Sequence, residues 1–175
     1  MKVAAGVLGP TAFVAAWAIA GARRAGYSPV DDAISRLAEV GASSRPLMNA
    51  GFVTFGVAVP TFAVAARQAL GPPATAALVV AGLSTLGVAA TPLGPGPDTA
   101  HGVFAGIGYL AMAAAPVLAD RRRGALVSAI AAASLVATTV GPAHGMFQRL
   151  GLGVVDAWIV VTALRQRREK RSGAP

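Results

Sequence analysis

The chain has 175 residues, of which 55% are hydrophobic and only 13% are charged, and its mean hydropathy is +0.62. In a soluble globular domain about a quarter of the residues are charged, so this composition argues against a soluble domain and indicates a membrane protein. The net charge of +8 does not indicate nucleic-acid binding, because the basic residues cluster at the ends of apolar runs, where they specify membrane topology. The chain contains no cysteine, which excludes disulfides and thiolate metal sites.

Apolar runs follow one another along the whole chain. A transmembrane helix needs about 20 mostly apolar residues. We therefore predict an all-α, polytopic membrane bundle in one domain, 1–164, followed by a basic tail, 165–175, whose composition indicates disorder. The six predicted spans are 3–21, 47–66, 74–95, 102–119, 125–143 and 148–164.

The loop after the first span holds three of the seven acidic residues, within the stretch GYSPVDDAISRLAEVGASSRP at 26–46. Ser28 can act as an N-cap, Pro29 suits the first helical position, and Asp31 stands where a capping-box acid belongs.

Side chains further along this loop recur at helical spacing. Asp32 and Arg36 are four residues apart and can pair, and Gly41 is a natural helix stop. The apolar face consists of Val30, Ile34 and Leu37. The pattern predicts a short amphipathic helix over 29–40 that lies on the outer membrane interface. Alternatively, the charges of this loop only cap and solvate that helix.

Lysine and arginine predict the orientation of the bundle. With both termini in the cytoplasm, ten basic residues lie inside and five lie outside, as the positive-inside rule requires. The inside set is Lys2, Arg67, Arg121, Arg122, Arg123, Arg165, Arg167, Arg168, Lys170 and Arg171, and the outside set is Arg23, Arg24, Arg36, Arg45 and Arg149. We therefore expect both termini to be cytoplasmic.

Both histidines and four of the seven acids fall in the predicted outer loops. Asp156 lies within the sixth span, about 10 Å along the helix from Arg149. A charged residue inside hydrocarbon normally faces the bundle interior or a wet cavity, and marks a functional site. We hypothesise that one extracytoplasmic pocket, with Asp156 at its floor, holds a set of catalytic acid–base candidates. The candidates are Asp32, Ser35, Asp98, His101, His144 and Asp156.

Three of these candidates also have a structural alternative. Asp98 can be the N-cap of the fourth span, His144 can bond a loop carbonyl, and Asp156 can pair with Arg149. Any metal would fall on Asp98, His101 and His144. Because catalytic zinc takes three protein ligands and only two are histidine here, the sequence does not favour a bound metal or other cofactor.

Three stretches together resemble the domain-of-unknown-function 998 family. They are YSPVDDAISRLAEVGA from Tyr27, PLMNAGFVTFG from Pro46, and PDTAHG from Pro97. The most specific pattern is YSPxxDxIS, formed by Tyr27, Ser28, Pro29, Asp32, Ile34 and Ser35; Asn49, Gly51 and His101 also fit. The resemblance implies a small bacterial membrane protein of six or seven helices and no established activity.

Three functions remain open at this point. The first is an enzyme that acts on a lipid or isoprenoid at the outer leaflet of the bacterial plasma membrane. The second is a non-enzymatic protein that binds lipid, a small hydrophobic ligand or a partner. The third is a small proton-coupled transporter that uses Asp156, which the one-sided distribution of polar residues disfavours.

The topology can be tested with single cysteines at Ser43 and Ser172. We expect a membrane-impermeant thiol reagent to label the Ser43→Cys protein from outside intact cells and the Ser172→Cys protein only after the cells are opened. Labelling of both positions from the same side would show that the predicted topology is wrong.

Overall fold

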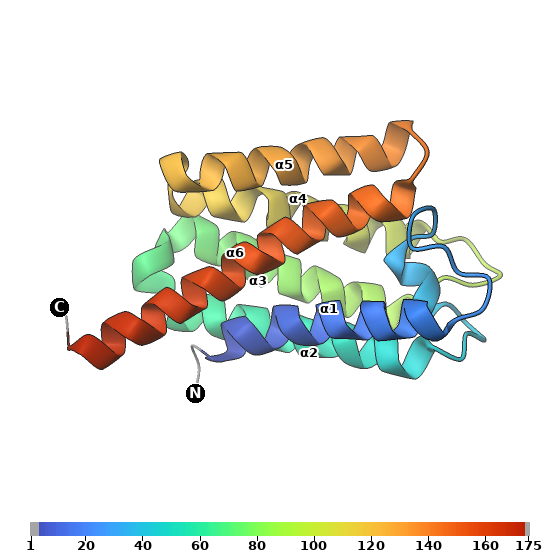
Figure 1. Ribbon diagram of the computed structural model, residues 1–175, viewed down its shortest axis with the longest axis horizontal. Helices are drawn as coiled ribbons and strands as arrows, with labels where there is room; N and C mark the ends of the chain where they lie inside the picture. The colour runs from blue at the N-terminus through green and yellow to red at the C-terminus, as the bar shows by residue number, and fades with distance from the viewer. Residues whose placement is uncertain (1–3, 174–175) are drawn as a thin grey trace.

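Six long antiparallel helices form the computed structural model, which describes residues 4–173 apart from the side chains of 170–172 (Figure 1). The helices are α1 (Ala5–Arg23), α2 (Arg45–Ala65), α3 (Arg67–Ala90), α4 (Thr99–Ala119), α5 (Arg121–Val140) and α6 (His144–Ser172). A short 3₁₀ helix, η2 (Ile34–Ala38), lies between α1 and α2. All six long helices are long and apolar enough to cross a membrane, and the described residues form no strand. The predicted all-α class and number of spans are therefore confirmed.

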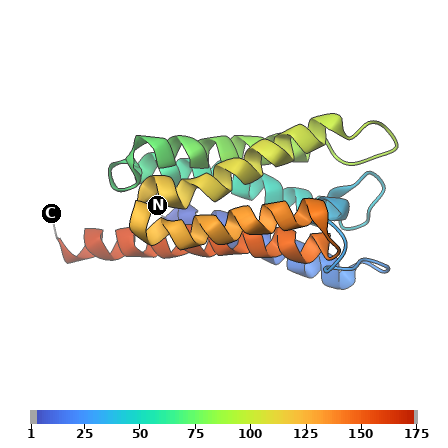
Figure 2. The same cartoon turned by 90° about the horizontal axis from the view of Figure 1, so that it is seen from above.

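The helices form a closed ring. Each packs against its neighbour in sequence, α6 packs against α1, and α6 also contacts α4. The α1–α2, α3–α4 and α5–α6 connections gather at one end, which we call the loop end (Figure 1). The other two connections and both chain ends lie at the opposite, terminal end, and the view turned by 90° agrees (Figure 2).

Local sequence determines the helix boundaries at the terminal end. Asp120 alone joins α4 to α5, and its carboxylate accepts the backbone N–H groups of Arg122 and Arg123 at 2.9 and 3.0 Å. These bonds, that from Arg123 above all, hold the pKa of Asp120 below its usual range. Gly71, with a φ of 75°, breaks α3 just before two prolines, so the long part of the helix begins near the predicted residue 74.

Small residues allow close helix packing, and aromatic rings fill the core at the loop end. A Cβ on either Gly56 or Gly82 would lie 3.0 Å from the carbonyl oxygen of the other, so the α2 and α3 backbones approach closely there. Phe13 lies with its ring centre 5.8 Å from that of Phe52 and 5.5 Å from that of Phe55.

The outer faces of the helices are apolar. Large aliphatic side chains are exposed around the ring, including Leu110, Leu126, Val136 and Val140. A soluble monomer rarely exposes contiguous apolar surface on this scale, whereas lipid chains solvate it well. The bundle is that of a multi-pass membrane protein.

The predicted amphipathic helix over 29–40 is wrong. Only Ile34–Ala38 is helical, as a 3₁₀ helix, and the residues before it form turns. Tertiary hydrogen bonds replace the helical ones: the Ile34 N–H donates to Oε1 of Gln148 at 2.7 Å, and the Met146 N–H donates to the Val30 carbonyl at 2.9 Å. As a result Ile34 is buried in the bundle, and Val30 is exposed rather than part of an apolar face.

The predicted disorder from Arg165 onward is also wrong for the described part of the tail. The last helix does not stop near residue 164 but continues as α6 to Ser172. Arginine and glutamate are good helix formers, so the basic tail extends the apolar span without a break.

Burial of Leu37 provides a stability test. Leu37 is fully buried beneath the first loop, so Leu37→Asp should lower the free energy of unfolding by about 2 kcal/mol or more through lost apolar burial and a buried charge. Val30→Asp puts the same charge on a side chain that is 46% exposed and should change the stability little. Thermal unfolding in detergent measures both. Equal effects of the two variants would contradict the buried position of Leu37.

Candidate functional site

Arg149, in the second turn of α6, holds the first loop in place. Its Nη1 donates to the carbonyl oxygens of Pro29 at 2.8 Å, Asp32 at 3.1 Å and Gly145 at 2.8 Å. Its Nη2 donates to the Tyr27 hydroxyl. A guanidinium presents several N–H donors in a rigid fork, so one side chain can satisfy carbonyls from two segments at once.

Tyr27 extends the same network. Its hydroxyl donates to the carbonyl oxygens of Asp32 and Ala33, at 3.3 and 3.2 Å. The guanidinium carbon of Arg149 lies 5.3 Å from the ring centre of Trp17 and 5.5 Å from that of Tyr27, which adds cation–π attraction. Burial raises the pKa of Tyr27, and the neighbouring Arg149 charge opposes this only in part, so the hydroxyl keeps its proton at neutral pH.

The first turns of α6 complete the attachment of the loop. Gln148 is buried; its Oε1 accepts the Ile34 N–H, and its Nε2 donates to the Tyr109 hydroxyl on α4. A Cβ at position 145 would lie 2.8 Å from the Pro29 carbonyl oxygen, so only glycine allows this approach. α6 therefore docks on the first loop through Gly145, Gln148 and Arg149.

The acidic side chains of the first loop, 24–44, form hydrogen bonds and ion pairs within that loop. Asp32 accepts the Ser28 N–H at 2.8 Å and lies 3.8 Å from Arg36, which confirms the predicted pair. The Ser28 hydroxyl accepts the Asp31 N–H at 3.2 Å, which is one of the two bonds of a capping box, and donates to the Asp31 carboxylate at 2.7 Å; a turn follows instead of an α-helix. The structural alternative for these charges therefore accounts for their contacts.

Each histidine is bonded to a nearby main-chain carbonyl. Nδ1 of His101 lies 2.7 Å from the carbonyl oxygen of Thr91, and Nδ1 of His144 lies 2.8 Å from that of Thr138. These contacts join the two ends of the α3–α4 connection and of the α5–α6 connection. Within the described part of the chain, no three His, Asp or Glu side chains are grouped as metal ligands.

Three other candidates line separate hollows. Asp98, whose carboxylate accepts the Gly94 N–H at 3.3 Å, lies at the loop end beside Arg36. Ser35 lines a cavity of about 50 Å³ inside the bundle, and Asp156 lines a groove of about 470 Å³ between α1 and α6. The structure does not bring these three side chains together, and a catalytic role for any of the six candidates stays a prediction.

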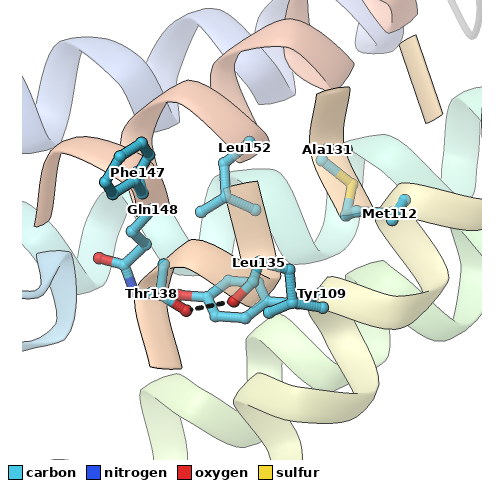
Figure 3. A pocket seen from close by; sticks show the side chains of 10 residues that line it. Tyr109, Met112, Ala131, Leu135, Thr138, Phe147, Gln148 and Leu152 are labelled. Atoms are coloured by element: carbon cyan, nitrogen blue, oxygen red, sulfur yellow. Dashed lines mark hydrogen bonds between the residues drawn. The ribbon is translucent and has the colours of Figure 1, made fainter. Parts of the chain in front are cut away.

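A smaller cavity of about 20 Å³ lies between α4, α5 and α6 (Figure 3). Tyr109 and Gln148 bond to each other at its wall, and the Thr138 hydroxyl donates to the Leu135 carbonyl at 2.6 Å. The remaining lining is mainly apolar. Because it is little larger than the volume of about 10–15 Å³ that one water needs and its lining is mainly apolar, we regard this cavity as a packing void.

Asp156 is the buried acid without a partner. It is 2% exposed, and neither carboxylate oxygen has a hydrogen-bond partner among the described residues. The suggested pairing with Arg149 is wrong, because the Nη atoms of Arg149 bond to the first loop instead. Asp156 lies about 10 Å further along α6 than Arg149, so it is separated from the carbonyl groups that accept hydrogen bonds from Arg149.

The sequence comparison assigns the family. The family model described as "Protein of unknown function (DUF998)" matches residues 7–165. The chain belongs to this family. The matched region includes all six candidate residues and the Arg149 network, so the resemblance found in the sequence is confirmed. No curated protein and no solved structure matches this DUF998 chain.

Tyr27, Gln148 and Arg149 of this DUF998 protein form one cluster that is not predicted from the sequence. The available signal was the polar pair Gln148–Arg149 near the start of a long apolar helix, where side chains with several donors must find acceptors.

The attachment of the first loop can be tested at Arg149. Arg149→Lys keeps the charge but loses the fork that reaches several carbonyls, so the free energy of unfolding should fall by about 2 kcal/mol and amide exchange should accelerate over residues 28–35. Arg36→Lys is the control, because Arg36 is exposed and its ion pairs are long, and it should cost well under about 1 kcal/mol. Thermal unfolding and hydrogen exchange in detergent measure both. Unchanged exchange in Arg149→Lys would mean that the loop does not depend on this side chain.

Proposed function

We propose that this DUF998 protein is a non-enzymatic, lipid-binding membrane protein whose ligand lies in the α1–α6 groove against Asp156. The supporting observation is a carboxylate that is buried in a membrane-spanning helix beside this groove, with no partner among the described residues. Ionisable residues inside membranes normally pair within the bundle or mark a substrate site. A partner from outside the chain would relieve this cost; because both carboxyl oxygens are covered while the groove is empty, the Asp156 side chain must turn toward the groove to meet it.

The groove suits one elongated apolar molecule. Its volume of about 470 Å³ falls within the range of small-molecule sites, roughly 300–1,000 Å³. Small side chains at Ala15, Ala18 and Ala157, together with Gly153, keep its walls low. The lining residues are Pro10, Thr11, Val14, Ala15, Ala18, Gly153, Asp156, Ala157, Val160 and Val161. Since the groove opens on a lipid-facing side of the ring, a ligand can reach it directly from the bilayer.

The carboxylate specifies the polar part of the ligand. A carboxyl group accepts hydrogen bonds in either protonation state, so a ligand with a donor such as a hydroxyl or an ammonium group can pair with it. A neutral hydrogen bond contributes about 0.5–1.5 kcal/mol, and one in which a partner is charged, as an ammonium group is, contributes about 1.5–3 kcal/mol. An amphipathic molecule with an apolar chain and a hydroxyl or amino group meets both requirements.

The polar side chains at the loop end favour an enzymatic function less than the groove favours lipid binding. His101 and His144 are each bonded to a main-chain carbonyl, and Asp32 is bonded to Ser28 and Arg36. A general base must reach the proton that it removes, and these groups are engaged in loop structure. A carrier would need polar groups at mid-depth that are reachable from both sides, and Asp156 supplies only one such group.

We also propose that the terminal end faces the cytoplasm of a bacterial plasma membrane. The support is the positive-inside rule, since the exposed arginines of the terminal end far outnumber its acids. These arginines are Arg67, Arg121, Arg122, Arg123, Arg165, Arg167 and Arg168.

Lipid retention tests the proposed function. Native mass spectrometry of protein purified in mild detergent should show one retained lipid-like molecule on the wild type. Asp156→Asn should reduce its occupancy roughly tenfold through loss of the charged acceptor. Ala157→Phe should reduce it as well, because the ring fills the groove and leaves the carboxylate unchanged.

The matched control is Ala132→Phe, which adds the same ring to an exposed position on α5 away from the groove and should retain the ligand. Equal occupancy in wild type, Asp156→Asn and Ala157→Phe would rule out this site. A wild type that carries no lipid, and that takes up neither dodecanol nor dodecylamine when these are added, would rule out the function.

A further inference from the structure

The cavity of about 50 Å³ beneath η2 is separate from the α1–α6 groove and shares none of its lining residues. It lies within the ring, because its walls come from η2 and from every long helix except α5. Five aromatic rings line it, those of Phe13, Phe52, Phe55, Phe104 and Tyr109, and none of its lining side chains carries a formal charge. Such a lining favours a neutral, largely apolar occupant.

Ser35 places a free hydroxyl at this cavity. The residue is 8% exposed, and its hydroxyl makes no hydrogen bond to any described residue. Its oxygen is not among the fully buried unpaired atoms, so it keeps some accessible surface, and an unpaired hydroxyl in such a position is free to bond water or a ligand. Thr85, another hydroxyl on the lining, already donates to the Ala81 carbonyl at 2.9 Å, so it does not share this property.

Tyr109 contributes a second hydroxyl to the lining. Its oxygen accepts from Gln148, and its own proton has no acceptor among the described residues. The cavity is thus lined by two residues with unused donors and no unused anionic acceptor. A ligand acceptor can pair with one of these protons, whereas a ligand that only donates would leave both unused, so an acceptor fits the cavity better.

We propose that the cavity binds the carbonyl end of a neutral, apolar molecule, with Ser35 as the hydrogen-bond donor and the four phenylalanine rings around the carbon atoms. The volume of about 50 Å³ is larger than one water needs, about 10–15 Å³ on the same kind of measure, but too small for a whole lipid. The rest of the molecule therefore extends out of the cavity.

Phe104 lies between the cavity and the outer face of α4, on the path that the rest of the bound molecule would take. It lines the cavity and is also 37% exposed on the outer face of α4. Its ring lies over Gly87 of α3, where a Cβ would overlap the ring, so no side chain at that position blocks the ring from turning. Rotation of Phe104 opens a route between α3 and α4 to the surrounding lipid.

Direct binding of matched probes tests this proposal. The protein is placed in phosphatidylcholine nanodiscs, and binding of radiolabelled 2-dodecanone and dodecane is measured with empty nanodiscs subtracted. The wild type should bind the ketone roughly threefold to tenfold more tightly than the alkane, as expected for one neutral hydrogen bond. Ser35→Ala should remove this preference, Ala105→Leu should block both probes by filling the cavity, and Phe104→Ala should accelerate their binding.

Ala132→Phe serves as the control, because Ala132 is exposed on α5, which contributes nothing to the cavity wall, and this variant should bind 2-dodecanone as the wild type does. Equal affinity of the wild type for ketone and alkane, or an unchanged ketone preference in Ser35→Ala, would overturn the proposal. Loss of ketone binding in Asp156→Asn alone would also overturn it, since the probe would then occupy the groove.

Discussion

The hydrogen bonds from Arg149 to the main chain of the first loop are the interaction on which the rest of the structure depends. Backbone carbonyls removed from water must find donors, and a charged guanidinium removed from water must find acceptors. Arg149 on α6 and the carbonyls of Pro29 and Asp32 solve both problems together. Because the loop joins α1 to α2, this contact also seats α6 against α1, closes the ring, and presses η2 onto the aromatic core.

The polar side chains of the protein divide into two groups by whether the fold satisfies them. At the loop end, the histidines, Asp32 and Gln148 are bonded to the main chain, so their scarce charge and polarity go into holding the loops. Inside the bundle, Asp156 and Ser35 are buried without partners among the described residues. Asn49 Oδ1 and Arg149 Nε are also buried without a partner, but only Asp156 and Ser35 line a groove or cavity that a ligand could occupy.

The sequence predicts the parts of this structure that depend on local composition. Apolar runs bounded by arginine, proline and glycine locate all six spans, because length and hydropathy alone decide whether a helix can cross lipid. The first loop escapes prediction: its helical spacing is real, but Gln148 and Met146, more than a hundred residues away, take the backbone groups that a helix would use. Asp156 is predicted correctly as a buried acid from its position within a span. The two histidines are candidates by residue type alone, and each of them bonds a nearby main-chain carbonyl. Which polar groups remain unsatisfied depends on tertiary contacts that no local pattern encodes.

An unpartnered carboxylate should make the protein less stable than it could be, and this is the most direct test of the role assigned to Asp156. Sites kept for ligands commonly cost stability, and replacing an unpartnered buried carboxyl group by an apolar side chain should recover it. Thermal unfolding of delipidated protein in detergent compares the wild type with Asp156→Leu, whose apolar side chain branches at the same carbon as that of aspartate. We predict that the variant is more stable, by roughly 1 kcal/mol or more. A variant less stable than the wild type by a similar amount would show that the carboxylate has a partner within the fold and would contradict its assignment to a ligand.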